Sequence, residues 1–463
     1  MTRFFRVFVP TTAVVLLISE ILLITSAFVV ASYISLEADP WVNLRYLGGF
    51  SNLIPVLVTI LMGMHFNDLY SQYYVKSRIV LLQQLCLVMG GAFLVQGFWS
   101  YLSPDMRVSA RVMALGSIFA VVSIFLWRVL FSTFAGTIVG RNSLLLVGGS
   151  PLLEDIARFL DGHQELGLEV AGYVDDAHPV GQPLFGGKVL GGLTELKDIV
   201  HVTQPSRVVV GMSERRNRVP VAELLELRFA GQIIEEAASA YERICGRVCL
   251  KELRPSQLIY SGELGPRRQS VLVQGLLNRV AAAAGIIVAS PLMLITALAV
   301  KFTSPGPILY RQVRVGQDDV PFTVYKFRSM RADAEAKTGA VWASKDDPRV
   351  TPVGKIIRKI RFDELPQLFN TLKGDMSLVG PRPERPEFVQ ELSMKIPYYR
   401  QRHCVKPGIT GWAQINFKYG DTLEDTMTKL EYDLYYIKNM SLSLDTYILF
   451  HTVKAMLLSR GSQ

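Results

Sequence analysis

Four long apolar stretches near the N-terminus constrain this 463-residue chain more than any other feature. Each stretch is close to the ~20 residues that a helix needs to cross a bilayer. A cleaved signal peptide would explain only the first stretch, and the apolar part of that stretch is too long for one. The sequence therefore predicts a four-helix transmembrane block over residues 1–135, with spans at Val9–Ile34, Tyr46–Phe66, Ile79–Trp99 and Ser109–Phe131.

Basic residues beside these stretches predict how the block is oriented. Most of them fall on one side of the expected membrane, namely Arg3, Arg6, Lys76, Arg78, Arg128 and Arg141. The other side has mainly Arg45 and Arg107. Because segments rich in Lys and Arg stay in the cytoplasm, both ends of the block are predicted to be cytoplasmic. Glu20 falls within the first span, either as a functional group or as a buried acid with a polar partner on a neighbouring helix.

After Gly140 the chain changes to short apolar runs that alternate with amphipathic segments, which is typical of an α/β unit. Residues 143–147 indicate a buried strand, followed by a turn at Gly148-Gly149-Ser150 and a helix from Pro151 to Leu160. The other expected strands are Val170–Val174, Arg207–Val210 and Gln232–Glu235, and the other expected helices are Glu195–Val202 and Val221–Phe229. These elements predict a Rossmann-like cytoplasmic domain over residues 140–262.

The turn at Gly148 suggests a dinucleotide site, because it follows a strand and opens a helix. The full Gly-x-Gly-x-x-Gly spacing is absent, however, since Leu152 and Leu153 stand where the third glycine would be. We therefore favour a structural or regulatory domain over an NAD-binding catalyst.

Composition excludes several other classes. A hydrophobic content of 50% is far too high for a disordered chain. The net charge of +9 does not indicate nucleic-acid binding, because the basic residues concentrate beside apolar segments. Cys245 and Cys249 lack the further ligands that a zinc site needs, so the four cysteines are expected to be free thiols in a reducing compartment.

A fifth apolar run, Val280–Val300, is interrupted near its middle by Ser290-Pro291. Proline removes a backbone donor and clashes with the preceding turn of a helix. Basic residues flank the run on both sides, namely Arg267, Arg268, Arg279, Lys301, Arg311 and Arg314. Because basic flanks favour the cytoplasm, we expect a re-entrant helix over 279–302 that bends at Ser290 and Pro291 and returns. A kinked fifth span, which would export everything after it, is the alternative.

Five motifs then follow in order, at Ser304–Gly316, Tyr325–Met330, Asp363–Asn370, Lys373–Pro383 and Lys406–Gln414. From about Asn278 onwards the chain resembles the bacterial sugar transferase family, the polyprenyl-phosphate phosphoglycosyl transferases. With the preceding helices and the Rossmann-like domain, it is similar to the long form of the family, which includes undecaprenyl-phosphate glucose phosphotransferases of exopolysaccharide, capsule or O-antigen synthesis. The resemblance implies a small α/β catalytic domain over residues 272–463, on the cytoplasmic face of the bacterial inner membrane.

The resemblance also implies a reaction. Asp363 would attack the β-phosphorus of a UDP-sugar, release UMP and carry the sugar phosphate until undecaprenyl phosphate takes it. The expected donor is a hexose such as UDP-glucose or UDP-galactose, although no residue separates these from N-acetylated sugars. Membrane lipids and a second copy of the chain are the other expected partners. A membrane-anchored regulator or scaffold without transferase activity is the alternative.

Local sequence gives Asp363 a structural role as well. It precedes Glu364-Leu365-Pro366 and an apolar-periodic run, which predicts that Asp363 is the N-cap of a helix with proline in its first turn. The free amides and the dipole there would keep the carboxylate ionised and attract phosphate. Without the surrounding motifs, a simple helix cap would be the better interpretation.

Cations must offset the charge of two phosphates and a carboxylate. The resemblance implies Mg²⁺ on Asp363, with Glu364 as a second ligand or proton handler. The resemblance also implies that the substrate-binding residues are Lys326, Arg328, Arg358, Gln367 and Arg382.

Several neighbouring residues leave their roles open. The basic residues Lys355, Arg358, Lys359 and Arg361 could instead contact lipid headgroups. Arg361-Phe362 before the aspartate departs from the usual family pattern, which puts the fit of donor or acceptor in doubt. We expect His403 to be structural, and Asp433 and Asp445 match family positions without an assigned role.

Overall fold

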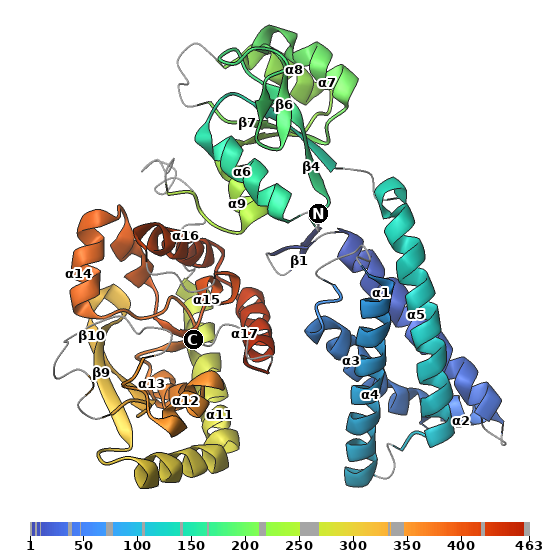
Figure 1. The fold of residues 1–463 in the computed structure, drawn as a ribbon, viewed down its shortest axis with the longest axis vertical. Coiled ribbons are helices and arrows are strands. Elements are labelled where there is room, and N and C mark those ends of the chain that lie inside the picture. Colours follow the sequence, from blue (N-terminus) through green and yellow to red (C-terminus); the bar gives the residue numbers. More distant parts are fainter. Residues whose placement is uncertain are drawn as a thin grey trace. The chain divides into compact units, whose positions relative to one another are not determined.

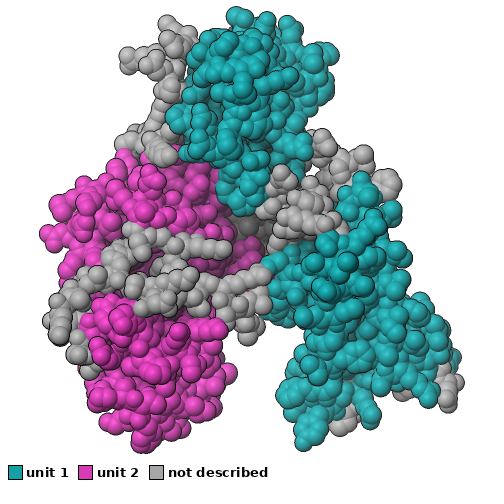
Figure 2. Space-filling view, in the orientation of Figure 1, with its two compact units in different colours: residues 1–4, 8–236 teal, residues 5–7, 237–463 magenta. Residues whose placement is uncertain are grey.

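The computed structural model of the protein describes residues 2–4, 7–9, 11–35, 39–46, 48–70, 77–103, 107–138, 142–163, 166–212, 219–250, 268–331, 334, 347–417 and 422–457. The chain divides into two compact units (Figures 1 and 2). Unit 1 consists of residues 1–4 and 8–236, and unit 2 consists of residues 5–7 and 237–463.

Long apolar helices make up the first part of unit 1. A short strand pair, β1 (Thr2–Phe4) and β2 (Val7–Val9), precedes them. The helices are α1 (Thr11–Ser35), α2 (Pro40–Tyr46), α3 (Gly49–Phe66), α4 (Arg78–Leu102) and α5 (Ala110–Ile138). All of them except α2 are long and apolar enough to cross a membrane. Their positions agree with the four predicted spans to within a few residues at most ends.

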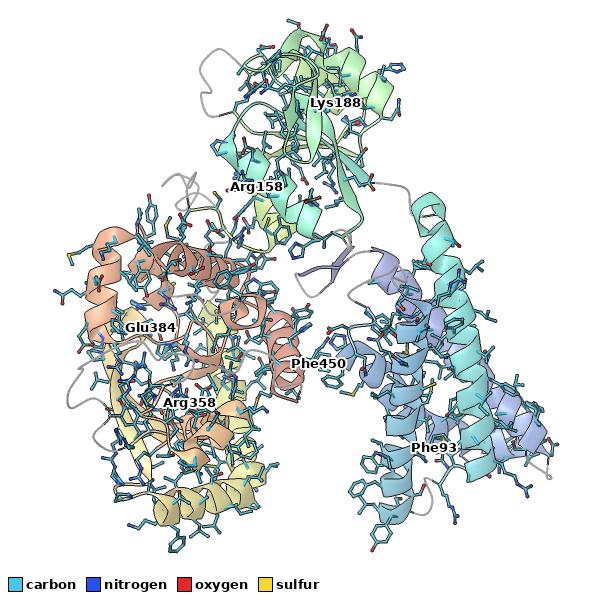
Figure 3. The ribbon with its side chains drawn as sticks, in the orientation of Figure 1. Phe93, Arg158, Lys188, Arg358, Glu384 and Phe450 are labelled. Carbon is cyan, nitrogen blue, oxygen red and sulfur yellow. The ribbon has the colours of Figure 1, made fainter. Side chains whose placement is uncertain are left out.

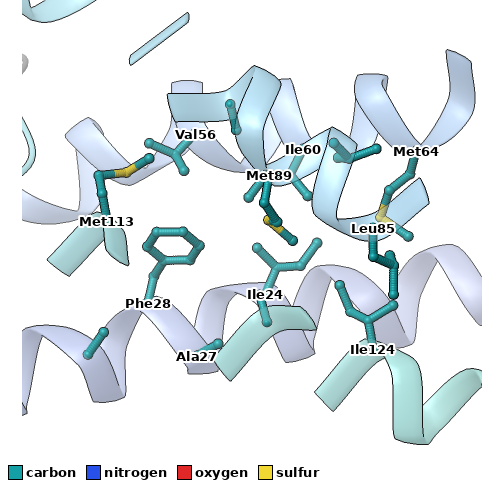
Figure 4. Packing of buried hydrophobic residues seen from close by; sticks show 14 of the residues in the cluster. Ile24, Ala27, Phe28, Val56, Ile60, Met64, Leu85, Met89, Met113 and Ile124 are labelled. Carbon is teal, nitrogen blue, oxygen red and sulfur yellow. The ribbon is translucent and has the colours of Figure 1, made fainter. Parts of the chain in front are cut away.

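These helices share one apolar core, which Figure 4 shows at close range. Ile24 and Phe28 of α1 pack there with Ile60 of α3, Leu85 of α4 and Ile124 of α5. Close approach of α1 and α5 depends on Gly116, because a β-carbon there would lie 2.5 Å from Cδ1 of Phe28.

The outward-facing side chains of these helices are also apolar. Leu22, Leu94 and Ile118 are 66%, 78% and 57% exposed, respectively. Such a surface is unfavourable in water and suits contact with lipid. Together with their length and composition, it makes the protein a membrane protein.

A buried ion pair joins α1 to α5. Arg128 donates through Nε to Oε1 of Glu20 at 2.7 Å and through Nη1 to the carbonyl of Leu69 at 2.6 Å. Glu20 and Arg128 are 0% and 3% exposed. Of the two interpretations of Glu20, burial with a polar partner on a neighbouring helix is confirmed. Counting Arg128 among the basic residues beside the spans was wrong, because the residue lies inside α5 and neutralises this acid.

The second part of unit 1 is a mixed six-stranded sheet with the strand order β5-β6-β4-β3-β7-β8. Neighbouring strands are parallel except β5 and β6. The strands are β3 (Asn142–Val147), β4 (Leu168–Val174), β5 (Pro183–Leu184), β6 (Gly187–Gly191), β7 (Arg207–Val210) and β8 (Ile234–Glu236). The accompanying helices are α6 (Pro151–Gly162), η3 (Leu193–Glu195), α7 (Leu196–Thr203) and α8 (Val221–Phe229).

Central β3 explains why the sheet forms. Residues 144–147 are completely buried, as expected for a parallel strand that is covered on both faces. The predicted bounds of β7 and α8 are confirmed. Strands β5 and β6 were not predicted, because they are short and contain Pro or Gly in place of an alternating apolar pattern.

Unit 2 begins with α9 (Ala237–Cys245) and α11 (Arg268–Thr303). An antiparallel hairpin follows, made of β9 (Leu309–Val315) and β10 (Pro321–Phe327) with η4 (Gln317–Asp319) between them. The next elements are α12 (Pro352–Lys359), η5 (Phe362–Glu364), α13 (Gln367–Lys373), β11 (Ser377–Val379), α14 (Pro386–Lys395) and η6 (Tyr399–Cys404). The last are β12 (Gly408–Thr410), parallel to β11, and the helices α15 (Trp412–Asn416), α16 (Leu423–Asn439) and α17 (Leu442–Leu457).

The long helix α11 contains Ser290 and Pro291, where the break is predicted. Its ribbon changes direction along its length (Figure 1), and Pro291 lies inside it. Ser290 donates through Oγ to the carbonyl of Ile287 at 2.8 Å, which is the carbonyl that Pro291, four residues later, cannot reach with a backbone N–H. Residues Val271–Thr303 form a fifth helix that is long and apolar enough to enter a membrane. Whether both of its ends stay on one side is still a prediction.

Residues 237–250 pack within unit 2. Tyr241 and the backbone amide of Leu250 donate to the two carboxylate oxygens of Glu431 at 3.1 and 3.0 Å. Trp412 donates through Nε1 to the carbonyl of Gly246 at 2.7 Å. The contacts of α9 therefore lie with the C-terminal half of the chain, and the predicted domain limits, 140–262 and 272–463, stay predictions.

Candidate active site

Helix α12 places Arg358 in its last turn. Thr351 begins the helix by accepting from the Gly354 amide through Oγ1 at 2.9 Å, and Pro352 occupies the first turn. Gly354 is required there, because a β-carbon would lie 1.9 Å from the carbonyl oxygen of Ser329. The start of α12 is thus fixed against the backbone that follows β10. Figure 3 marks the position of Arg358 in unit 2.

A tight turn after α12 carries the two acids. Helix α12 ends at Lys359, Arg361 turns the chain in the left-handed region with φ 57°, and the single 3₁₀ turn η5 then holds Asp363 and Glu364. Both acids are buried, at 8% and 9% exposure. The predicted N-cap role of Asp363 was wrong: Pro366 is the N-cap of α13, which begins at Gln367. Leu365 and Pro366 are both in the right-handed helical region, so η5 leads directly into α13.

Asn370 connects these acids to strand β10. It donates through Nδ2 to the carbonyl of Thr323 at 2.7 Å and accepts at Oδ1 from the amide of Tyr325 at 3.1 Å. The fully buried Asn370 side chain thus satisfies backbone hydrogen-bonding groups of strand β10, as a neighbouring strand would. The next residue of the strand is Lys326, so Asn370 fixes this cation beside η5. Sequence reasoning gave Asn370 no role, although it ends the motif that contains Asp363.

Three cations surround Glu364. Lys326 Nζ lies 2.9 Å from Oε1, Arg382 Nη2 lies 3.3 Å from the same oxygen, and Arg361 Nη1 lies 3.6 Å from Oε2. Burial would raise the pKa of Glu364, but these cations outweigh it and hold the pKa well below its usual range. Glu364 is therefore a permanent negative charge that orders its neighbours.

Asp363 has a different environment. Burial, with the adjacent charge of Glu364, raises the pKa of Asp363 to about 6, and Lys326, Arg358 and Arg382 oppose the rise. Within the part of the chain that the structure describes, no hydrogen bond occupies its carboxylate. Asp363 is thus a buried carboxylate that is ionised at neutral pH, is surrounded by cations and has both oxygens available to a substrate.

A second buried ion pair, Arg402 with Asp433, fixes the backbone of Arg382. Arg402 donates through Nη2 to the carbonyl of Arg382 at 3.0 Å and lies 2.8 Å from Oδ2 of Asp433. Arg402 and Asp433 are both buried. Asp433, which had no assigned role, therefore positions the backbone of Arg382 through Arg402.

Asp445 performs a comparable task for α11. It accepts from Gln274 of α11 and, at 2.8 Å, from the Tyr436 hydroxyl. The same hydroxyl donates to the Val379 carbonyl at 3.3 Å. Asp445 thereby joins α17, α16 and α11 next to β11.

The remaining predicted residues lie as follows. Arg328 is buried and donates through Nη2 to the carbonyl of Ser304 at 2.7 Å, so it connects β10 to the end of α11, and its role with substrate stays a prediction. Gln367 is buried at the start of α13. His403 pairs through Nδ1 with Oδ1 of Asp319 at 2.6 Å, which supports a structural role. Of the other basic residues, Lys355 and Lys359 are exposed on α12.

The acids can be compared with what a metal ion needs. Mg²⁺ binds one or two carboxylates and completes its shell with water and substrate phosphates. Asp363 fits this requirement, because its buried carboxylate has no protein donor in the described residues. Both oxygens of Glu364 already contact cations. No group of three His, Cys, Asp or Glu side chains that could hold a metal occurs in the described ranges.

Comparisons with known proteins agree with this site. The family model for bacterial sugar transferases matches residues 269–459, which include both acids and all the cations around them. A UDP-N-acetylgalactosamine-undecaprenyl-phosphate N-acetylgalactosaminephosphotransferase of Aeromonas hydrophila is 47% identical over 222 residues, which is 48% of this chain and 52% of that protein. A UDP-glucose:undecaprenyl-phosphate glucose-1-phosphate transferase of Klebsiella pneumoniae is 50% identical over 36% of each chain.

A longer match extends beyond the catalytic region. The UDP-glucose:undecaprenyl-phosphate glucose-1-phosphate transferase of Xanthomonas campestris pv. campestris is 33% identical over 335 residues, which is 69% of this chain and 67% of that protein. The chain therefore belongs to the bacterial sugar transferase family, as its motifs predicted. Its matches to the Aeromonas and Klebsiella proteins span about half of the former and about a third of the latter.

Proposed function

We propose that the protein transfers a sugar-1-phosphate from a UDP-sugar to undecaprenyl phosphate, as the first membrane step of exopolysaccharide, capsule or O-antigen synthesis. The observation that carries the proposal is the buried, unoccupied carboxylate of Asp363 beside Glu364 and its three cations. The names of the related enzymes support a nucleotide-sugar donor and this lipid acceptor.

In the first half-reaction, an oxygen of Asp363 attacks the β-phosphorus of the donor. A new bond forms between Asp363 and phosphorus, the bond from that phosphorus to the bridging oxygen breaks, and UMP leaves with that oxygen. With its pKa raised to about 6, Asp363 is ionised at neutral pH yet poorly solvated, which favours attack. Lys326, Arg358 and Arg382 offset the charge that accumulates on the phosphates.

In the second half-reaction, an oxygen of undecaprenyl phosphate attacks the same phosphorus. The bond to Asp363 breaks, the carboxylate is regenerated, and the product is a lipid diphosphate sugar. One phosphoanhydride replaces another, so no external energy source is needed. Splitting the transfer means that a soluble donor and a lipid acceptor need never occupy the site together.

Mg²⁺ is proposed as the cofactor, with Asp363 as its protein ligand. When bound, it would neutralise phosphate charge and polarise the reacting bond. Glu364 as a second ligand stays a prediction, because its oxygens already contact Lys326, Arg382 and Arg361.

We also propose the arrangement around this chemistry. The apolar helices α1, α3, α4 and α5 form a four-helix transmembrane block, the sheet of unit 1 is a Rossmann-like cytoplasmic domain, and α11 is re-entrant at Ser290 and Pro291 in the bacterial inner membrane. The catalytic domain then faces the cytoplasm, where nucleotide sugars are found. A homodimer is proposed as the assembly, and a monomeric mass in native detergent particles or nanodiscs would overturn it.

The decisive experiment measures UMP release by the full-length protein in nanodiscs with Mg²⁺. The donors are UDP-glucose, UDP-galactose and their N-acetylated counterparts, each with and without undecaprenyl phosphate. We expect turnover with a hexose donor, and one UMP per active site when the acceptor is omitted. Asp363→Asn should lower both by at least about 1,000-fold, since it removes the nucleophile.

Glu391→Gln is the matched control, because Glu391 is an exposed acid on α14 that pairs only with Lys395 in the described structure. It should retain wild-type rates. UMP release that requires the acceptor would contradict the covalent intermediate. No UMP from any donor would favour a regulator or scaffold that has kept the motifs without the activity.

A further inference from the structure

Two cations converge on Gly374, at the far end of α13 from the acids. Gly374 ends this helix with φ 97°, a conformation that glycine adopts without strain. The point where a β-carbon would stand lies 3.0 Å from Nη2 of Arg279 and 3.7 Å from Nζ of Lys406. A side chain at position 374 would crowd the Arg279 guanidinium, so the glycine lets a guanidinium and an ammonium group approach the same end of the helix.

Neither cation is neutralised by a close acid. Within the described residues, no hydrogen bond or ion pair occupies Arg279 or Lys406. The neighbouring acid, Asp375, pairs with Lys373 at 3.0 Å. Burial, and then repulsion from Arg279, lowers the pKa of Lys406, and Asp375 offsets this only in part. Two like charges held together in this way leave a local excess of positive charge that an anion would relieve.

The protein fixes this geometry with its own hydrogen bonds. Asn278, next to Arg279, donates through Nδ2 to Oγ of Ser377 at 2.7 Å. The amide of Ser377 donates to the carbonyl of Pro407, next to Lys406, at 2.8 Å. Ser377 thus bonds to the neighbours of both Arg279 and Lys406, so the two charges are positioned before any ligand binds.

The place of Arg279 on α11 indicates where the anion comes from. Arg279 directly precedes the apolar run 280–300, and it lies in the helix that is apolar enough to enter a membrane. A charged side chain at such a boundary extends to the level of the lipid phosphates. The seven residues of α13 separate Gly374 from the acids by roughly 10 Å, so this is a second site.

We propose that Arg279 and Lys406 together bind the phosphate group of a lipid at the membrane surface. Undecaprenyl phosphate and an anionic phospholipid present the same chemistry. The inference concerns binding alone and does not depend on the transferase reaction proposed above.

The test uses full-length protein in phosphatidylcholine nanodiscs and measures the thermal midpoint as lipid is added. One series contains undecaprenyl phosphate, one phosphatidylglycerol, and one inorganic phosphate in the buffer. We expect the midpoint to rise with at least one lipid, and Arg279→Gln and Lys406→Gln each to weaken the apparent affinity about five-fold. Lys406→Arg should retain most of the response, because it keeps the charge.

Lys301→Gln is the matched control, since Lys301 is an exposed cation at the other end of α11. It should respond like wild type, whereas general attraction of the basic surface to lipid would weaken all the variants equally. The lipid that produces the rise identifies the source of the phosphate. Equal titrations for wild type and both Gln variants, a response to inorganic phosphate alone, or no response to either lipid would overturn the proposal. Because no step measures UMP, failure here is distinct from failure of the proposed reaction.

Discussion

Two buried acids in this protein, Glu20 and Glu364, differ in how many cations contact them. Glu20 contacts one arginine, and that arginine uses another nitrogen on the Leu69 carbonyl. Glu364 contacts Lys326, Arg382 and Arg361, and a second acid, Asp363, lies next to it without a hydrogen bond of its own in the described structure. The first cluster balances its charge, and the second keeps cations in excess.

The difference separates structural from chemical use of the same residue types. A balanced pair with satisfied donors has nothing left to offer a ligand, and its value is in joining α1 to α5. An excess of fixed cations costs stability in the absence of substrate and is repaid when phosphates bind. Burial of a charged residue therefore does not by itself indicate a site, whereas burial with incomplete pairing does.

The largest expected effect comes from breaking the balanced pair. Arg128→Met leaves Glu20 buried without its cation, and we expect a loss of about 3–5 kcal/mol in the free energy of unfolding. Unfolding in mixed micelles with increasing SDS measures the change. The specific activity of the protein that remains folded should be unchanged, because Arg128 lies in the helix block, outside the catalytic unit.

The double variant Glu20→Gln, Arg128→Met sharpens this result. Removing both charges should recover more than half of the loss, since no unpaired charge remains. Arg78→Met, at the exposed start of α4, is the control and should be within about 0.5 kcal/mol of wild type. A double variant as unstable as Arg128→Met would show that packing of the long side chains, and not charge balance, stabilises this helix pair.

Neutralising the centre of the unbalanced cluster should affect catalysis more than folding. Glu364→Gln removes the charge that holds Lys326, Arg382 and Arg361, so the cations would no longer be positioned for the phosphates. We expect kcat/KM for the UDP-sugar to fall about 100-fold, the usual cost of a displacement near 1 Å. Steady-state UMP release measures it.

Glu384→Gln provides the comparison, because Glu384 pairs with Arg314 at 3.4 Å in the same unit (Figure 3). Glu384 is 23% exposed against 10% for Glu364, and its ion pair in the described residues is with Arg314, so the variant should change kcat/KM by less than about five-fold. If the two variants lose activity equally, the ordering role assigned to Glu364 is wrong.

Some parts of the fold could be predicted from the sequence and others could not. The apolar stretches, the strand Arg207–Val210 and the helix Val221–Phe229 were predictable, because local periodicity determines them. The Glu20–Arg128 pair was not, since no local signal connects residues 108 positions apart. Helix α9 was not predicted either. Its Tyr241 bonds to Glu431, 190 positions away, and no local pattern reveals such a contact.

Within the site, the motifs identified Asp363, Glu364, Lys326 and Arg382 as one group, and the structure brings the charged side chains of that group together. The N-cap prediction failed because Pro366 was expected in the first turn of the helix, after an N-cap at Asp363. In the structure Pro366 is itself the N-cap, and the helix begins at Gln367. The supporting roles of Asn370 and of Asp433 through Arg402 depend on contacts between distant segments, which no spacing in a single sequence reveals.

The smallest expected effect is a gain in stability from the variant that abolishes activity. The raised pKa of Asp363, about 6, means that the folded protein binds its proton more tightly than the unfolded chain does. Stability therefore falls as pH rises from about 4 to about 6, and the ionised carboxylate remains a cost above that range. Asp363→Asn removes the cost, so without substrate and with EDTA it should raise the free energy of unfolding by about 1–3 kcal/mol at pH 7.5. The thermal midpoint in detergent measures the gain, which should disappear at pH 4.5, where Asp363 is protonated in the folded wild type. A gain that persists at pH 4.5 would mean that the amide stabilises the turn through contacts unrelated to charge, and no gain at pH 7.5 would mean that the surrounding cations already compensate Asp363 as completely as Arg128 compensates Glu20.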